Sequence, residues 1–152
     1  MMCWYSNDQT TYTANKYGAL YKWYAVSPSN NGYKNLCPTG WHVPSDAEWT
    51  TLTDYLGGLS LAGGKMKSIG TQFWTSPNTG ATNESGFSGL PGGIRRDDNG
   101  GFVGVGGNGL WWSSTEYQTF YAWYRYLNNG SVELTRIATS KASGLSVRCL
   151  KD

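Results

Sequence analysis

The most informative segment of this chain is Cys37-Pro-Thr-Gly-Trp-His-Val-Pro-Ser-Asp-Ala-Glu-Trp49. Within it, Ser45 can cap the first turn of a helix, and Glu48, three residues later, can reach back to complete a capping box. Apolar residues then recur at helical spacing. A glycine pair at residues 57–58 supplies the left-handed conformation that ends a helix. The pattern predicts one main helix of about three turns over residues 46–56.

The same stretch begins with a cysteine that has a counterpart far along the chain. Cys37 lies just before the predicted helix, and Cys149 lies in a predicted strand near the C-terminal end. A disulfide between them would close a long loop, and the residues of that loop would extend from the bridge. Such a bridge indicates an oxidising compartment. The alternative is three buried thiols, because spacing alone does not establish pairing. If the pair forms, Cys3 is left over.

The composition suits one domain over residues 1–152 with an aromatic core. Aliphatic side chains are few, whereas there are eight tryptophans and eleven tyrosines. A net charge of +2 with scattered basic residues gives no reason to expect nucleic acid or an anionic membrane as partner. No apolar run approaches the roughly 20 residues that span a bilayer, so membrane insertion is not expected. The first residues lack a signal-peptide pattern, and we expect a trimmed N-terminus.

A hairpin is the clearest feature of the last third. Residues 121–128 and 131–137 flank an Asn-Gly pair at 129–130, a strong two-residue turn signal. This register places Leu127 opposite Val132 on the core face. The other face then carries Tyr124, Tyr126, Glu133, Thr135 and Ile137.

Shorter signals complete the pattern. Residues 110–115 read as a buried strand, residues 97–100 as a tight turn, and residues 145–149 as a last strand with alternating apolar side chains. A second short helix over residues 61–68 is interrupted by two glycines. One main helix, short strands and long glycine-rich loops predict the α+β class.

Several strings, in this order, resemble the Fibrobacter succinogenes major paralogous domain family, a secreted or lipoprotein-borne module of Bacteroidetes-type bacteria. They are Tyr17-Gly-Ala-Leu-Tyr-Lys-Trp23, the opening stretch, Gly86-Phe-Ser-Gly-Leu-Pro-Gly-Gly93, Trp111-Trp-Ser-Ser-Thr-Glu116 and Ser146-Val-Arg-Cys149. The resemblance covers nearly the whole chain. Members of that family carry further N-terminal strands, so we expect the first layer here to be incomplete.

That family is similar in turn to the formylglycine-generating-enzyme-like branch of the C-type lectin-like fold. The resemblance implies a twisted antiparallel sheet with a flanking helix, whose long loops and upper strands bind ligands. Related modules serve as variable proteins of diversity-generating retroelements, with randomised positions near the C-terminal end. By analogy, variation is expected between residues 117 and 143.

The residues give little support to enzymatic chemistry, so no catalytic residue, cofactor or metal is assigned. His42 is the one histidine, and its apolar neighbours favour a packed, hydrogen-bonded structural residue. Neither the reactive cysteine pair of formylglycine-generating enzymes nor a zinc-ligand spacing is present. Asp97-Asp98-Asn99 favours plain turn chemistry over a calcium site, and a structural calcium stays open.

The remaining candidate is the surface of the last third, whose composition is that of an antibody paratope, with rigid tyrosines and adaptable small polar residues. The predicted ligand-binding residues are Tyr117, Thr119, Tyr121, Tyr124, Tyr126, Asn128, Glu133, Thr135 and Ile137. Tyr124 and Tyr126 are expected to be exposed, the alternative being that they pack under a neighbouring loop. Arg125 and Arg136 are expected to stack on Trp123 or to meet Glu116. The core is expected to hold Trp41, Trp49, Trp111 and Trp112.

These observations predict a non-enzymatic, extracellular or cell-surface module that binds a protein or cell-surface ligand. One alternative is a calcium-independent carbohydrate-binding module that uses Tyr124 and Tyr126 as aromatic platforms. Another is a structural or assembly module of a surface protein.

Overall fold

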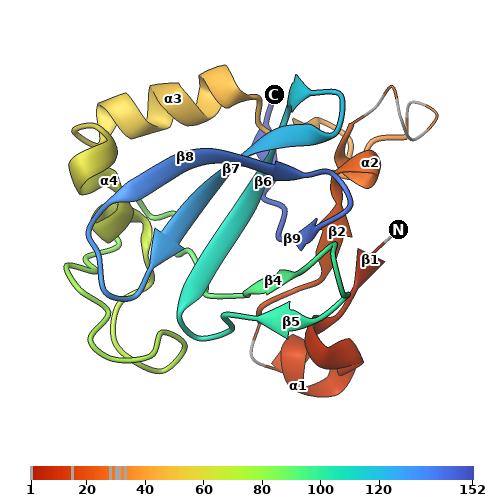
Figure 1. Cartoon of the computed structure of the whole chain (residues 1–152). Coiled ribbons are helices and arrows are strands. Elements are labelled where there is room, and N and C mark those ends of the chain that lie inside the picture. The colour runs from red at the N-terminus through yellow and green to blue at the C-terminus, as the bar shows by residue number, and fades with distance from the viewer. Residues whose placement is uncertain (1, 15, 28, 30–31, 33) are drawn as a thin grey trace.

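The computed structural model describes residues 2–14, 16–27, 29, 32 and 34–152. Its longest strands form a three-stranded antiparallel sheet of β6 (Asn108–Gln118), β7 (Tyr121–Asn128) and β8 (Leu134–Ser140), in that order. Helices α3 (Asp46–Tyr55) and α4 (Leu59–Met66) lie together beside this sheet in Figure 1. The architecture is mixed, mostly sheet with few short helices, as the α+β prediction requires.

A second sheet lies on the other side of the molecule (Figure 1). Its order is β1 (Met2–Cys3), β2 (Leu20–Lys22), β9 (Gly144–Leu145), β4 (Ile94–Arg95) and β5 (Phe102–Val103). A two-stranded sheet pairs β3 (Trp41–His42) with β10 (Leu150–Lys151). The short helical elements η1 (Tyr5–Asn7), α1 (Gln9–Ala14) and α2 (Trp23–Val26) belong to the N-terminal part.

The predicted main helix is confirmed. The Ser45 hydroxyl accepts from Glu48 N at 3.3 Å, and Ser45 N donates to Glu48 Oε2 at 2.8 Å, which completes the capping box. The helix ends at Tyr55, and the next residue caps it. Gly57 and Gly58 then take the left-handed φ values of 98° and 88° that favour glycine.

The second helix begins and ends two residues earlier than predicted, and its two glycines do not interrupt it. A Cβ at Gly63 would lie 2.1 Å from the Glu133 carbonyl oxygen, so α4 can approach the β7–β8 loop only with glycine there. Gly64 N donates to Val132 O at 2.9 Å in the same contact. The glycines therefore serve packing rather than helix termination.

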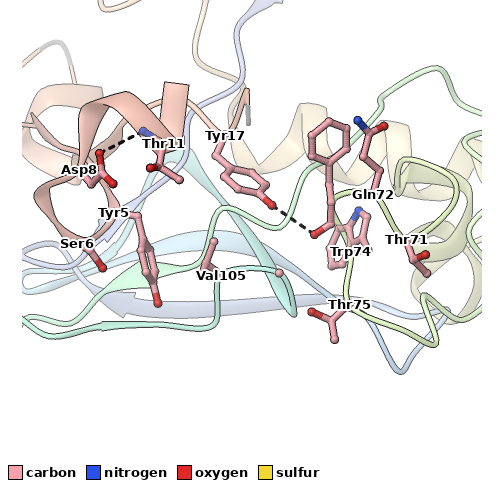
Figure 2. A pocket seen from close by; sticks show the side chains of 12 residues that line it. Tyr5, Ser6, Asp8, Thr11, Tyr17, Thr71, Gln72, Trp74, Thr75 and Val105 are labelled. Atoms are coloured by element: carbon pink, nitrogen blue, oxygen red, sulfur yellow. Dashed lines mark hydrogen bonds between the residues drawn. The ribbon is translucent and has the colours of Figure 1, made fainter. Parts of the chain in front are cut away.

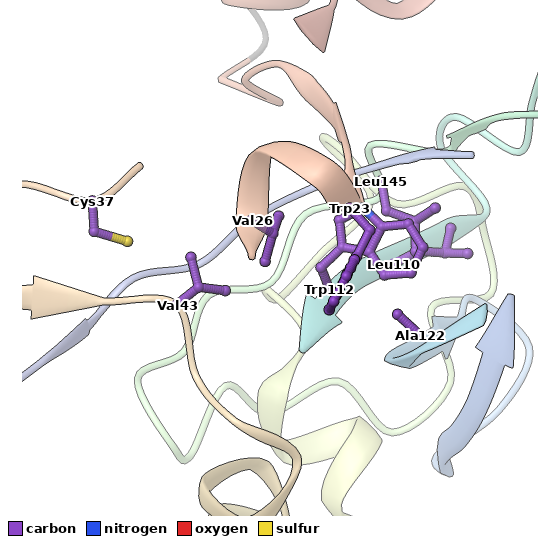
Figure 3. Packing of buried hydrophobic residues seen from close by; sticks show 8 residues of the cluster. All are labelled: Trp23, Val26, Cys37, Val43, Leu110, Trp112, Ala122 and Leu145. Atoms are coloured by element: carbon purple, nitrogen blue, oxygen red, sulfur yellow. The ribbon is translucent and has the colours of Figure 1, made fainter. Parts of the chain in front are cut away.

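Aromatic rings form two cores, one on each face of the three-stranded sheet. One contains Trp23 and Trp112 with Leu145, gathered beside β6 in Figure 3. The other contains Trp49, Trp74 and Trp111 under α3 and α4. The buried indole nitrogens donate to main-chain oxygens, such as Trp23 Nε1 to Ser113 O at 2.9 Å and Trp112 Nε1 to Tyr21 O at 2.7 Å. Burial of the rings therefore leaves no cost of an unpaired N–H at these positions.

One predicted core residue is on the surface. Trp41 is 40% exposed, whereas the other three tryptophans assigned to the core are buried. Trp41 lies in the short β3–β10 sheet, and its side chain lines a cleft of about 380 Å³ with Phe87 and Leu150. The apolar residues of this segment predict burial, but the two-stranded β3–β10 sheet lies at the surface of the fold.

The predicted hairpin forms, but its register differs. Leu127 pairs with Leu134 rather than with Val132, so residues 128–133 make a longer loop. Lys67 Nζ holds that loop open by donating to Asn128 O at 3.0 Å and Ser131 O at 2.7 Å. The shift equals two residues, which keeps each side chain on its predicted face.

The predicted last strand is divided between two sheets. Gly144–Leu145 joins the five-stranded sheet and Leu150–Lys151 joins β3, with Cys149 between them. The expected disulfide is present: Cys37 and Cys149 are joined, with their Cα atoms 5.8 Å apart and a sequence separation of 112. Cys3 is a free, half-buried thiol. Within the described part of the chain, no helix has the length and apolarity needed to cross a bilayer.

Candidate functional site

An exposed rim forms where β6 turns back into β7 (Figure 1). We define the rim as residues 116–121, every one of which is exposed. Its aromatic side chains are 48% exposed at Tyr117, 70% at Phe120 and 45% at Tyr121. Three exposed rings within six residues at the end of a sheet are unusual for a surface that meets only water.

The structure separates the predicted site residues into two groups. Exposed in the rim or on β8 and the residue before it are Tyr117, Thr119, Tyr121, Glu133, Thr135 and Ile137. Half-buried are Tyr124, Tyr126 and Asn128. Phe120, the most exposed of the rim aromatics, is not among the predicted binding residues.

The expectation that Tyr124 and Tyr126 are exposed is wrong. The Tyr124 ring packs edge-on against Trp112 with centroids 6.2 Å apart, and burial raises the pKa of the Tyr124 phenol. The Tyr126 hydroxyl donates to Asn108 Oδ1 at 3.1 Å and accepts from Asn128 Nδ2 at 3.0 Å. The core around Trp23 covers this face of β7, so both faces of that strand are packed. A binding role for these two tyrosines stays a prediction.

The opposite face of β7 carries a stack of side chains that continues the rim. The Tyr117 and Trp123 rings lie 4.5 Å apart, and the Arg136 guanidinium lies 3.6 Å from the Trp123 ring centroid. Arg136 therefore stacks on Trp123 as predicted. This arrangement fixes three flexible or bulky side chains at the surface, which lowers the entropy lost when a partner binds.

A partly buried carboxylate, that of Asp46, holds this stack to the main helix. Asp46 Oδ1 accepts from Arg125 Nη1 at 2.7 Å, and Asp46 Oδ2 accepts from Arg136 Nη2 at 2.8 Å. The Arg125 side chain is almost completely buried. Burial raises the pKa of Asp46, but the hydrogen bonds from Arg136 and Arg125 outweigh it and leave that pKa below its ordinary value. Arg125 thus meets Asp46, not Trp123 or Glu116.

A second cation ties the rim to the other core. Lys141 is buried, with its Nζ 2.9 Å from Glu116 Oε2 and donating to Thr119 O at 2.9 Å. The same Nζ lies 4.6 Å from the Trp23 ring centroid. Lys141 therefore attaches the rim to this core at Glu116 and at Thr119.

His42 is bonded as predicted but less packed than expected. Its Nδ1 lies 2.6 Å from Asp152 Oδ1 and its Nε2 2.9 Å from Glu48 Oε1. Hydrogen bonds from the His42 ring to the carboxylates of Asp152, first, and Glu48 raise the pKa of His42. With both ring nitrogens engaged, His42 links the capping box of α3 to the last residues of the chain.

The acidic turn at residues 97–100 is accounted for by its own contacts. Asp98 forms an ion pair with Arg96 and accepts from Asn99 N at 2.7 Å, while Asn99 Oδ1 accepts from Gly101 N at 2.8 Å. Among the described residues, no three His, Cys, Asp or Glu side chains converge as metal ligands would.

Comparison with known proteins gives one match. The chain matches the family model described as the Fibrobacter succinogenes major domain over residues 1–151. No curated protein and no solved structure matches it.

Proposed function

We propose a function from one premise: this chain belongs to the Fibrobacter succinogenes major domain family. The proposed function of the chain is that of a non-enzymatic ligand-binding module, whose contact surface is the rim together with the exposed side chains of β8. The observation that carries this function is the unbroken exposure of residues 116–121, with three aromatic rings among them.

The anchoring of the rim supports recognition over chemistry. Lys141 fixes the main chain at Thr119, and Arg136 fixes the neighbouring stack. A surface held this way loses little conformational entropy on binding, and large aromatic side chains contribute much of the energy in protein interfaces. The ligand that fits is a protein or another cell-surface molecule.

We also propose a fold family for the chain and the compartment in which it acts. We assign the chain to the C-type lectin-like fold, with the rim and β8 at its ligand-binding end. The Cys37–Cys149 disulfide suits an oxidising compartment, so the module acts outside the cell or at its surface. Diversification of residues 117–143 by a retroelement is part of the proposal. A nearby imperfect copy of the encoding DNA that differs at adenines would support it, and its absence would contradict it.

The test uses intact bacterial cells and an array of extracellular proteins as probes for the fluorescently labelled domain. Replacing Tyr117, Phe120 and Tyr121 together by alanine should abolish the signal, because hot-spot aromatics contribute about 2 kcal/mol or more each. The matched control is Tyr55→Ala, which removes an 85% exposed tyrosine from α3. Equal loss in both variants, or retention in the triple variant, would contradict a rim-based function.

A further inference from the structure

A cavity of about 500 Å³ lies between the N-terminal segment and the loop at residues 71–75, separate from the rim. Figure 2 shows Tyr5 and Asp8 on one side of it, Thr71 and Gln72 on the other, and Tyr17 between them. Its volume is within the range of small-molecule sites. Nothing in the ligand-binding surface described above uses it.

The two tyrosines are fixed by contacts with the protein. The Tyr17 hydroxyl donates to Phe73 O at 3.3 Å, and its ring meets the Phe73 ring edge-on at 6.1 Å. The Tyr5 ring lies 5.2 Å from the Phe102 ring and fits against Gly93, where an added Cβ would come within 2.8 Å of Tyr5 Cε2. The aromatic walls are therefore in place before any ligand arrives.

The opposite wall offers hydrogen-bonding capacity. In the part of the chain that the structure describes, the exposed side chains of Thr71, Gln72 and Thr75 hydrogen-bond to no protein group. Two hydroxyls and one amide can donate and accept in the same small area. A ligand that matches them must carry several hydroxyl or amide groups of its own.

The charge of the lining narrows the ligand further. Among the described residues that line the cavity there is no Lys, Arg or His, so these residues offer no counter-charge for an anionic ligand. Asp8 is the one charged residue among the described lining, and its carboxylate already accepts from Thr11 N at 3.1 Å. Fixed aromatic faces opposite uncharged donors and acceptors suit a molecule with both apolar faces and many hydroxyls.

From these contacts we propose that the cavity binds a short neutral oligosaccharide, with its apolar sugar faces against Tyr5 and Tyr17 and its hydroxyls bonded to Gln72, Thr71 and Thr75. The site is independent of the rim, so either can exist without the other.

The test is a titration of the isotope-labelled protein, followed by amide chemical shifts, with neutral trisaccharides of glucose, mannose, xylose and N-acetylglucosamine. At least one should shift the amides of residues 71–75 and 105–106 at millimolar concentration. Gln72→Ala should weaken that saccharide about five-fold, because one neutral hydrogen bond contributes about 1 kcal/mol. Gln9→Ala, which changes an exposed glutamine that is not among the lining residues, should leave the affinity unchanged.

Three results would overturn the proposal. They are the absence of cavity shifts with every saccharide, an affinity indifferent to Gln72→Ala, and stronger cavity shifts with choline or an unstructured peptide than with any saccharide. Since Thr71, Gln72 and Thr75 are exposed, their alanine variants should fold as the wild type does, which unchanged amide spectra elsewhere would verify.

Discussion

At the scale of single residues, Asp46 combines two structural roles in one carboxylate. It lies in the first turn of α3, where a negative charge favours the helix. It also forms ion pairs with both Arg125 and Arg136, which lie on the face of the sheet beneath that helix. Because the Arg125 guanidinium is buried, its charge depends on this partner. The rim stack is thus positioned by a residue that no surface inspection would select.

Asp46→Asn should therefore lower the free energy of unfolding by about 3–5 kcal/mol, the usual cost of leaving a buried charge unpaired. The pKa of Asp46 in the folded state lies below its unfolded value, so this stability is present above about pH 4 and is lost as the pH falls through the folded pKa. Urea unfolding of both proteins should therefore converge in acid. Asp54→Asn on the same helix is the control, and an equal loss there would contradict the argument.

At the scale of elements, local and distant determinants behave differently. α3 could be predicted to within a residue because its cap, Ser45 with Glu48, lies inside the helix start itself. The hairpin register could not, because Lys67, about sixty residues before the loop, decides where the strands stop pairing. Tyr124 was misplaced for the same reason: the core that covers it comes from α2 and β6. The sequence of a strand shows how apolar and polar side chains alternate between its two faces. It does not show which of those faces another element of the fold covers.

Lys67 should accordingly be the residue on which the β7–β8 loop depends. It is fully buried, and its Nζ donates to three carbonyls, those of Thr79, Asn128 and Ser131. Burial lowers its pKa to about 8. Lys67→Met leaves the Thr79 and Ser131 carbonyls without this donor, each at a cost of about 1–3 kcal/mol, whereas Asn128 O still accepts from Ser131 N at 3.4 Å. The substitution should therefore speed hydrogen exchange across residues 128–133. Lys65→Met, at a more exposed ion pair with Glu84, is the control; equal exchange in the two variants would refute this role.

At the scale of the whole molecule, the Cys37–Cys149 disulfide and the exposed rim have separate roles. The disulfide joins the approach to α3 with the end of the chain, and the rim stands at the turn of the longest strands. Residues 116–121 could be singled out from the sequence because aromatic and hydroxyl residues concentrate there. The cavity by Tyr17 could not, since its walls come from segments more than fifty residues apart whose proximity only the fold creates.

The Cys37–Cys149 disulfide should stabilise the fold without taking part in ligand binding. Replacing Cys37 and Cys149 together by serine should lower the free energy of unfolding by about 2–5 kcal/mol, since a loop of this length loses a large constraint in the unfolded chain. Cys3→Ser should cost far less, because Cys3 forms no disulfide. Reductant should destabilise the wild type and Cys3→Ser alike and leave the double variant unchanged in chemical denaturation. Binding by the folded fraction of the double variant should persist, because the rim is attached through Lys141 and Asp46 rather than through the disulfide; loss of binding in protein that is still folded would contradict this division.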